Sequence, residues 1–328
     1  MKKYNVYGIG HALVDMEFKV NDALLQKLEL TKGAMMLVDE EQQGKLLAAV
    51  GESKIHRSCG GSASNTMIGL AQFGGKGFHS CKVANDETGR FFAADMQKNG
   101  VDNALADTTH PGTTGKCLVL ITPDAERTMC THLGISESFA VENLSEEHLA
   151  QAEYLYIEGY LVSSPSACQA AIEAAQMARK LGVKVAMTFS DLFMIKLFRD
   201  GMDKIIGDGL DLLFCNENEA LEYTGTDDLE RAAQELKKIT RQYGLTLGPK
   251  GAKLYNGSEI FSTPGIPAQA IDTNGAGDLF AGTFLYGITH GMSFPQAGSL
   301  ACRASSVLVT QYGARLQADQ APGIIKAQ

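Results

Sequence analysis

Apolar and polar residues alternate near the N-terminus, and apolar residues then recur at helical spacing. Alternation is typical of half-buried strands, and recurrence every three to four residues is typical of amphipathic helices. Strands are predicted over residues 4–10, 12–20, 78–84, 116–121 and 127–133, the last two separated by a turn-like Thr-Pro-Asp-Ala. Helices are predicted over residues 21–28, 40–50 and 62–73. These short strands indicate a small sheet that stands apart from the core.

Beyond residue 154 the pattern becomes a regular exchange of apolar runs and amphipathic segments. Strands are predicted over 154–157, 183–188, 210–215 and 245–247, with a β-rich stretch over 252–271. Helices are predicted over 165–181, between 188 and 210, and over 217–224, 229–241, 277–290 and 294–310. Such alternation indicates right-handed βαβ crossovers, and therefore an α/β fold with a parallel sheet covered on both faces.

Length and composition fit one core with a small appendage. The chain has 328 residues, of which 45% are hydrophobic and 20% charged, and it has 35 glycines against 8 prolines. These values are ordinary for a folded enzyme with many tight loops. We expect one domain over residues 1–328, since neither an internal repeat nor a low-complexity segment is visible.

Charge and cysteine usage narrow the classes of function and the compartment. A net charge of −9 disfavours a nucleic-acid binder, which needs a basic surface, and favours a small-molecule substrate. The seven cysteines form no C-x-x-C pair, and no apolar run has the length of a membrane helix. We therefore expect a soluble, reduced, cytoplasmic protein that meets no membrane. The seven histidines show no HExxH pattern, so a histidine metal site is not expected.

The stretch Asp-Thr-Asn-Gly-Ala-Gly-Asp, residues 272–278, stands directly before an apolar helix. Backbone amides of Gly275, Ala276 and Gly277 can converge there on an anion, because no bulky side chain intervenes and the helix dipole adds positive charge. A carboxylate at Asp278 would repel that anion, unless it accepts a proton from a hydroxyl that attacks a phosphorus. The alternative is an acidic residue that merely stabilises the first turn of a helix.

Two polar stretches in the first third suit a ligand rich in hydroxyl groups. Gly60 and Gly61 lead into a predicted helix in which Asn65 offers an amide that both donates and accepts. Asp15 follows the first strand, where ligands of α/β sheets bind, and its carboxylate could take two neighbouring hydroxyls. Each stretch also has a plain structural interpretation, as a capped helix and as an exposed acid at a strand end.

Two further stretches follow strands in the second half. Asn216 and Glu219 are three residues apart at a strand-to-helix junction, which suits oxygen ligands for Mg²⁺ but equally a capping box. Gly248 and Gly251 bracket a turn after a strand, where a nucleotide phosphate could approach the backbone. The Walker ending G-K-[ST] is absent, and so is a G-x-G-x-x-G motif near the start, which weakens a dehydrogenase interpretation.

Taken together, these stretches resemble the ribokinase (pfkB) family of sugar and nucleoside kinases over the whole chain. Residues 60–75 look like the first signature of that family and residues 272–287 like its second. The resemblance implies a ribokinase-like three-layer α/β/α core with a small β-sheet lid, placed roughly at residues 12–37 and 108–134. It also implies ATP-dependent phosphorylation of a hydroxymethyl group.

The resemblance assigns roles to individual residues. Catalysis falls to Asp278 with the amides of Gly275, Ala276 and Gly277, and magnesium to Asn216 and Glu219. Substrate binding falls to Asp15, His11, Gly60, Gly61, Asn65, Arg127 and Tyr160. Nucleotide binding falls to Thr246, Gly248, Gly251 and Asn274, and Asp272 matches a position that in many members lies by a monovalent-cation site, such as one for K⁺.

Within the family the likeness is strongest to adenosine kinases, in the run "TGKCLVLITPDAERTMCTHLG" and the segment "FSDLFMIKLFRDGM". The resemblance implies phosphorylation of the 5′ hydroxyl of a ribonucleoside, with adenosine expected. His11 stands where adenosine kinases commonly have asparagine, which puts the preferred base in doubt. A kinase of ribose, fructose or a related sugar is the first alternative, and a non-catalytic ligand-binding homologue the second. A monomer and a homodimer formed through the lid are both compatible with the sequence.

Overall fold

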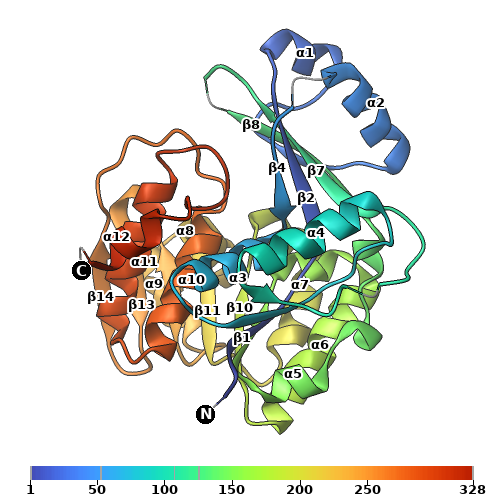
Figure 1. The fold of residues 1–328 in the computed structure, drawn as a ribbon. Coiled ribbons are helices and arrows are strands. Elements are labelled where there is room, and N and C mark those ends of the chain that lie inside the picture. Colours follow the sequence, from blue (N-terminus) through green and yellow to red (C-terminus); the bar gives the residue numbers. More distant parts are fainter. Residues whose placement is uncertain (1, 52–53, 107, 125, 327–328) are drawn as a thin grey trace.

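A nine-stranded sheet with the strand order β14-β13-β12-β11-β10-β9-β1-β5-β6 forms the centre of the protein (Figure 1). The structure is a computed structural model, and it describes residues 2–51, 54–106, 108–124 and 126–326. Neighbouring strands from β12 to β6 are parallel, and the antiparallel pair β13 and β14 extends one edge. The strands are β1 Tyr4–Ile9, β5 Gly77–Ser80, β6 Val101–Asp102, β9 Ala152–Ile157, β10 Lys184–Thr188, β11 Leu212–Asn216, β12 Tyr243–Thr246, β13 Gly251–Tyr255 and β14 Ile260–Pro264.

Helices cover both faces of this sheet, each over its own apolar cluster. One face carries α3 Ser62–Gln72, α4 Glu87–Lys98, α10 Ala276–Thr289 and α11 Phe294–Leu308, with α12 Gln320–Lys326 packed on α11. The other carries α5 Glu146–Ala150, α6 Pro165–Lys180, α7 Leu192–Ile206, α8 Glu217–Thr224 and α9 Leu229–Leu236. The α/β class and the three layers expected from the alternating pattern are confirmed. None of the helices described is both long and apolar enough to span a bilayer.

A second sheet of five strands, in the order β3-β8-β7-β2-β4, rises above the core (Figure 1). Its strands are β2 Leu13–Lys19, β3 Met35–Leu37, β4 Lys54–Gly60, β7 Thr114–Ile121 and β8 Arg127–Gly134. Helices α1 Asp22–Lys27 and α2 Glu40–Val50 pack on its outer face through an apolar cluster that includes Phe18 and Leu46. The inner face is turned towards the core and lines a cavity.

Several predicted elements differ from the observed ones. The segments 12–37 and 108–134 leave out β4 and α2, which belong to this second sheet and its cover. The strand predicted over 78–84 ends at Ser80, the helix predicted over 229–241 ends at Leu236, and the stretch 252–271 is strand only as far as Pro264. Helix α4, strands β3, β4 and β6, and helices α5 and α12 were not predicted. The turn predicted over 122–125 includes residue 125, which lies outside the described residues.

Candidate active site

A cavity of about 820 Å³ lies between the two sheets, at the carboxyl ends of the parallel strands. The loops that follow β1, β9 and β10 contribute His11, Glu158 and Asp191 to its wall. The first turn of α8, which follows β11, contributes Glu219. Open α/β sheets bind ligands at this edge because the strand ends leave backbone groups and loop side chains free of the sheet. The inner face of the second sheet closes the cavity from above. The apolar or sulfur side chains that it contributes are Leu13, Met35, Leu37, Cys117, Val119, Met129 and Leu133.

Asp278 lies in the first turn of α10, and its carboxylate faces this cavity. Oδ1 accepts a hydrogen bond from Ser62 Oγ (2.7 Å) and Oδ2 one from Asn65 Nδ2 (3.3 Å). The helix has no side-chain cap, because its N-cap residue is Gly275. The carboxylate therefore bonds to α3 rather than to its own helix, which speaks against the simple capping interpretation.

Burial raises the pKa of Asp278 to about 6, and the hydrogen bonds from Ser62 and Asn65 oppose that rise. Desolvation disfavours the charged carboxylate, whereas donors stabilise it. At neutral pH the group is therefore mostly ionised and basic enough to accept a proton.

Gly275 gives α10 its abrupt start. Its φ of 71° lies in the left-handed region, and a Cβ there would come within 2.6 Å of Ala314 Cβ and 2.7 Å of Ala314 O. Only glycine fits this backbone conformation and this close approach. Gly275 and Gly277 line the cavity, whereas the Ala276 amide donates to Thr273 O (3.3 Å). The start of a helix that opens onto a cavity is an anion site, because its first amides have no carbonyl partner within the helix.

Gly60, the last residue of β4, and Gly61 form the junction at which the chain passes from the second sheet to α3. Gly61 is the N-cap of α3 with a φ of 94°, and a Cβ there would lie 2.2 Å from the carbonyl oxygen of His11. Gly61, Ser62 and Asn65 line the cavity, as predicted for Gly61 and Asn65. Gly60 does not reach it, but a Cβ at Gly60 would lie 2.2 Å from Asp15 Oδ1, so this glycine makes room for that carboxylate.

Asp15 lies on β2 of the second sheet, not at the end of the first core strand as expected. The chain leaves β1 at Ile9 and enters β2 at Leu13, so three residues separate the two sheets. The carboxylate nevertheless lines the cavity. Burial raises its pKa to about 7, against the opposing charges of Arg315 and Arg127.

His11 and Tyr160 both line the cavity, as predicted. The His11 ring is buried, and its Nδ1 lies 3.1 Å from Ser136 O and 2.9 Å from Ser136 Oγ. Burial lowers the pKa of His11 to about 4, so its imidazole is neutral at physiological pH. Tyr160, in a 3₁₀ turn after β9, is partly buried against the core.

Glu158 is a buried acid in the cavity wall that the sequence reasoning missed. It accepts hydrogen bonds from the amides of Ala63 (2.7 Å) and His11 (3.3 Å) and thereby ties the loop after β1 to the start of α3. Burial raises its pKa to about 8 despite these donors. The signal was present, because Glu158 directly follows the apolar strand Tyr154–Ile157, the same context that singled out Asn216.

Asn216 and Glu219 form the capping box that was one of their two interpretations. Glu219 N donates to Asn216 Oδ1 (2.9 Å), and Asn216 N donates to Glu219 Oε2 (3.0 Å). Asn216 Nδ2 also donates to Glu219 Oε1 (2.7 Å). Both side chains line the cavity, and burial raises the pKa of Glu219 to about 7. Within the described chain no three His, Cys, Asp or Glu side chains cluster closely enough to hold a metal ion by themselves.

Arg127 of β8 crosses from the second sheet to the core and forms an ion pair with Asp272, just before α10. Asp272 also accepts hydrogen bonds from the amides of Gly313 (2.7 Å) and Asn274 (2.9 Å). Glu17 Oε1 lies 3.8 Å from Arg127 Nη1. Arg127 and Asp272 both line the cavity, as does Asn274. The positive charge of Arg127 therefore already pairs with Asp272, the acid that was expected near a monovalent cation.

The predicted nucleotide segment is only partly brought to the cavity. Thr246 lines it at the end of β12, where its hydroxyl donates to Cys215 O (3.4 Å). Gly248 begins a 3₁₀ turn and Gly251 begins β13, and neither lines the cavity. A Cβ at Gly251 would lie 2.0 Å from Thr263 O, so this glycine serves the close pairing of β13 with β14.

Comparison with known proteins identifies the fold. The model of the family described as "pfkB family carbohydrate kinase" matches residues 34–321. A crystal structure of a probable sugar kinase protein from Rhizobium etli CFN 42 is 33% identical with a TM-score of 0.92, covering 100% of this chain and 99% of that one. The adenosine kinase from Sinorhizobium meliloti is 32% identical, also with a TM-score of 0.92, covering 99% and 100%.

Relatives from other organisms are also named adenosine kinases. Adenosine kinase 1 of Arabidopsis thaliana is 24% identical over 93% of this chain and 94% of its own length. The family match covers most of the chain, and the expected resemblance to ribokinase-family kinases near adenosine kinase is confirmed. Phosphotransfer to an alcohol group is the activity of this family. The chain therefore belongs to the pfkB family of carbohydrate kinases.

Proposed function

We propose that the protein transfers the γ-phosphoryl group of ATP to the 5′ hydroxyl of a ribonucleoside, with adenosine as the preferred acceptor. The observation that carries the proposal is the position of Asp278, whose carboxylate faces the cavity beside the open start of α10. A general base and an anion site then lie side by side, so that the acceptor hydroxyl and the phosphoryl group can be held in line for transfer.

Asp278 acts as the general base in this proposal. An acceptor hydroxyl that displaces Ser62 or Asn65 from the carboxylate can give its proton to Asp278 while the oxygen attacks phosphorus. The bond from that phosphorus to the bridging oxygen breaks, and ADP leaves. The amides of Gly275 and Gly277 stabilise the negative charge on the equatorial oxygens. The Ala276 amide is expected to contribute less, because it already donates to Thr273 O.

The wall of the cavity favours a nucleoside over a free sugar. Asp15, Gly61 and Asn65 offer polar groups for ribose hydroxyls, whereas the second sheet offers an apolar surface that includes Val119 and Met129. A free pentose has no apolar face to cover that surface, but a purine ring does. Closure of the second sheet over the site would also exclude water, which could otherwise take the phosphoryl group.

Asn216 and Glu219 fit a magnesium ion held through water and phosphate oxygens. Their oxygens line the cavity, and Mg²⁺ usually keeps several waters rather than an all-protein cage. When bound, the ion supplies positive charge at the phosphate oxygens. The protein's own part is to hold Glu219 in place, which the capping box does. A monovalent cation near Asp272 would have to compete with Arg127, so we expect K⁺ to stimulate turnover little.

A substrate panel tests the proposal. Adenosine, inosine, ribose and fructose are compared in a coupled assay of ADP formation, and we expect adenosine to give the highest kcat/KM. A preference for ribose or fructose would establish the free-sugar alternative. Calorimetric binding of a nucleoside without any ADP production would establish the non-catalytic alternative.

We place the reaction in the cytosol, a reducing compartment that suits the free thiols of all seven cysteines. Sedimentation of the purified protein distinguishes a monomer from a homodimer formed through the lid.

The acid side of the pH profile should report Asp278. Its pKa of about 6 lies above the ordinary value, and only the ionised form accepts a proton, so kcat/KM should fall as pH drops through about 6. Ser62→Ala removes a donor that stabilises the ionised form, so this limb should move up by about one pH unit. A limb that stays in place in Ser62→Ala would assign it to another group in the cavity, such as Asp15 or Glu219.

Glu219→Gln should weaken magnesium activation with only a small loss of stability, from the lost bond to Asn216 Nδ2. Glutamine still completes a capping box, but it lacks the negative charge that attracts the cation. We expect the Mg²⁺ concentration at half-maximal rate to rise about tenfold. Glu217→Gln is the matched control on the same turn, because Glu217 pairs with Lys250 and does not line the cavity. Equal Mg²⁺ curves for both variants would remove Glu219 from this role.

A further inference from the structure

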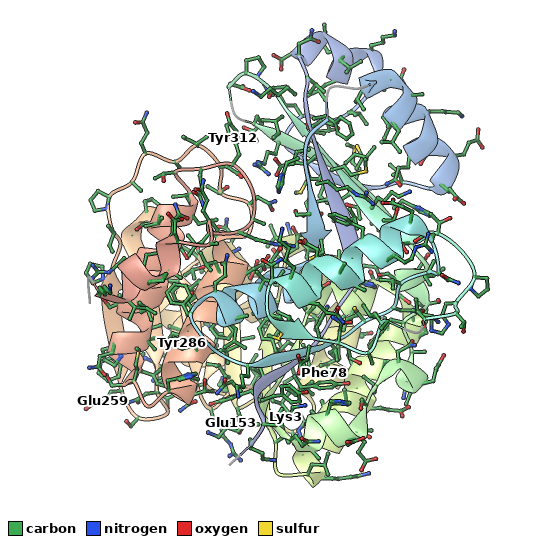
Figure 2. The ribbon with its side chains drawn as sticks, in the orientation of Figure 1. Lys3, Phe78, Glu153, Glu259, Tyr286 and Tyr312 are labelled. Carbon is green, nitrogen blue, oxygen red and sulfur yellow. The ribbon has the colours of Figure 1, made fainter. Side chains whose placement is uncertain are left out.

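A mostly buried arginine from the C-terminal part of the chain contacts Asn65, one of the residues that line the cavity. Arg315 lies in the loop after α11, three residues beyond Tyr312, which Figure 2 marks between α11 and the second sheet. Its side chain is only 14% exposed. The guanidinium donates from Nη1 to Asp95 Oδ2 (2.9 Å), from Nη2 to Cys59 Sγ (3.0 Å) and from Nε to Asn65 Oδ1 (3.4 Å).

The contact with Asn65 determines which end of that amide faces the catalytic acid. Arginine carries only donors, so it can bond to Asn65 only through Oδ1. The other end, Nδ2, then faces Asp278 Oδ2 at 3.3 Å. An ionised carboxylate only accepts hydrogen bonds, so both neighbours of Asn65 select the same orientation.

We propose that Arg315 is a positioning residue of the acceptor site, which holds the Asn65 amide with its NH₂ group towards Asp278 and places a positive charge near Asp15. The inference rests on the proposed function for its kinetic consequences but not for its geometry. Arg315 itself does not line the cavity, so it acts through these two side chains.

Asp95 of α4 anchors the arginine. Besides Arg315 Nη1, its Oδ2 accepts the amide of Cys59 (2.9 Å), and its Oδ1 faces Asn99 Nδ2 (3.2 Å). A charged pair with further hydrogen bonds on the acid is held firmly, because both ions are partly desolvated and the additional donors keep the carboxylate in place. A line of contacts therefore runs from Asp95 through Arg315 and Asn65 to Asp278.

The charge of Arg315 has a second effect, on Asp15. Arg315 Nη2 lies 3.0 Å from Cys59 Sγ, and Cys59 of β4 is paired with Val14, the neighbour of Asp15 on β2. Burial raises the pKa of this acid to about 7, Arg315 is the largest opposing influence, and Arg127 also opposes the rise. The neighbouring acids Glu17 and Asp278 add to the rise. Without Arg315, Asp15 would be protonated over more of the neutral range and would accept hydrogen bonds from ribose hydroxyls less well.

Two substitutions separate the charge from the hydrogen-bond geometry. Arg315→Gln removes both, so we expect KM for the acceptor to rise about tenfold or more, with a smaller fall in kcat. The fall of kcat/KM on the acid side should also begin at higher pH, because Asp15 is then protonated where Asp278 is still ionised. Arg315→Lys keeps the charge but cannot hold three partners in one plane. It should leave the acid limb in place and raise KM by a smaller factor.

An NMR measurement that does not depend on turnover tests whether Arg315 fixes the orientation of the Asn65 amide. The side-chain NH₂ signals of Asn65, assigned by their loss in Asn65→Ala, are followed by ¹H–¹⁵N NMR. We expect them to shift and to exchange faster with water in Arg315→Gln, because the fixed orientation is lost. Unchanged signals in a folded variant would overturn the proposal.

Arg179→Gln is the matched control for stability. Arg179 of α6 is likewise partly buried, but it donates to backbone carbonyls, at Ile206 O (2.8 Å) and Gly209 O (3.1 Å), and it does not line the cavity. It should lower the melting temperature without changing KM, the acid limb or the Asn65 signals. If Arg315→Gln behaved in the same way, Arg315 would be a structural residue only. If the wild type turned over no acceptor, the proposed function would fail, and the NMR comparison would still decide the role of Arg315.

Discussion

Asp278→Asn is expected to lower kcat by about 10³-fold while the protein folds and still binds its acceptor. Asparagine has nearly the same shape and can still accept the hydrogen bond from Ser62 Oγ, but it cannot take a proton from the attacking hydroxyl. Turnover is measured by ADP formation, folding by circular dichroism and melting temperature, and acceptor binding by calorimetry. The split between lost kcat and retained binding separates a base from a residue that only holds the substrate.

Asp228→Asn is the matched control, since Asp228 also stands at the start of a helix. Its carboxylate caps α9 by accepting hydrogen bonds from the amides of Glu230 (2.8 Å) and Arg231 (3.2 Å), and it does not line the cavity. This substitution should change stability slightly and leave kcat unchanged. A comparably small effect of Asp278→Asn on kcat would return Asp278 to the role of a helix-start acid and remove the base from the mechanism.

Gly275→Ala is expected to cost about 2–4 kcal/mol of stability and about 10² in kcat. The residue has a φ of 71°, and the new Cβ would lie within 2.8 Å of three atoms of Ala314. The start of α10 must therefore move, and the amides that would face the phosphoryl group move with it. Thermal unfolding and steady-state kinetics measure the two losses.

Gly277→Ala is the informative comparison, because nothing lies within 4 Å of a Cβ at this position. Alanine should stabilise the helix by about 0.5–1 kcal/mol, since glycine is the poorer helix former. The new methyl group would nevertheless point into the space near the anion site, so kcat should fall although stability rises. If Gly275→Ala lost stability but kept its kcat, the start of α10 would not hold the transferring group.

The sequence predicted the elements whose patterns are local. The alternation of apolar strands and amphipathic helices in the second half fixed the parallel sheet, and the glycine turn before Asp278 indicated the start of α10. Strand β4 was missed because its residues 54–60 mix polar and apolar types, and its pairing with β2 stabilises it. Helix α4 had local signals that were overlooked, namely the cap residue Asp86 and the apolar pair Phe92 and Met96.

The cavity could be predicted only in part, for a physical reason. Asp278, Asn65 and Glu219 stand in the first turns of helices, in stretches with strong local patterns, and each proved to line the cavity. Glu158 and Arg315 act through partners 95 and 250 residues away, so no local pattern marks what they touch. Asp15 was described as an acid at the end of the first core strand, although the predicted lid segment 12–37 includes it. Only three residues divide β1 from β2, so the pattern alone does not show where the core ends.

The product of the reaction tests the central claim most directly. The protein is incubated with ATP, Mg²⁺ and adenosine, and the mixture is followed by ³¹P NMR with proton coupling retained. Our account predicts a new phosphomonoester signal split by two protons, which identifies the 5′ CH₂–O–P linkage, and its absence when Asp278→Asn replaces the wild type. A signal from inorganic phosphate alone, or a phosphomonoester that forms equally well with Asp278→Asn, would contradict it.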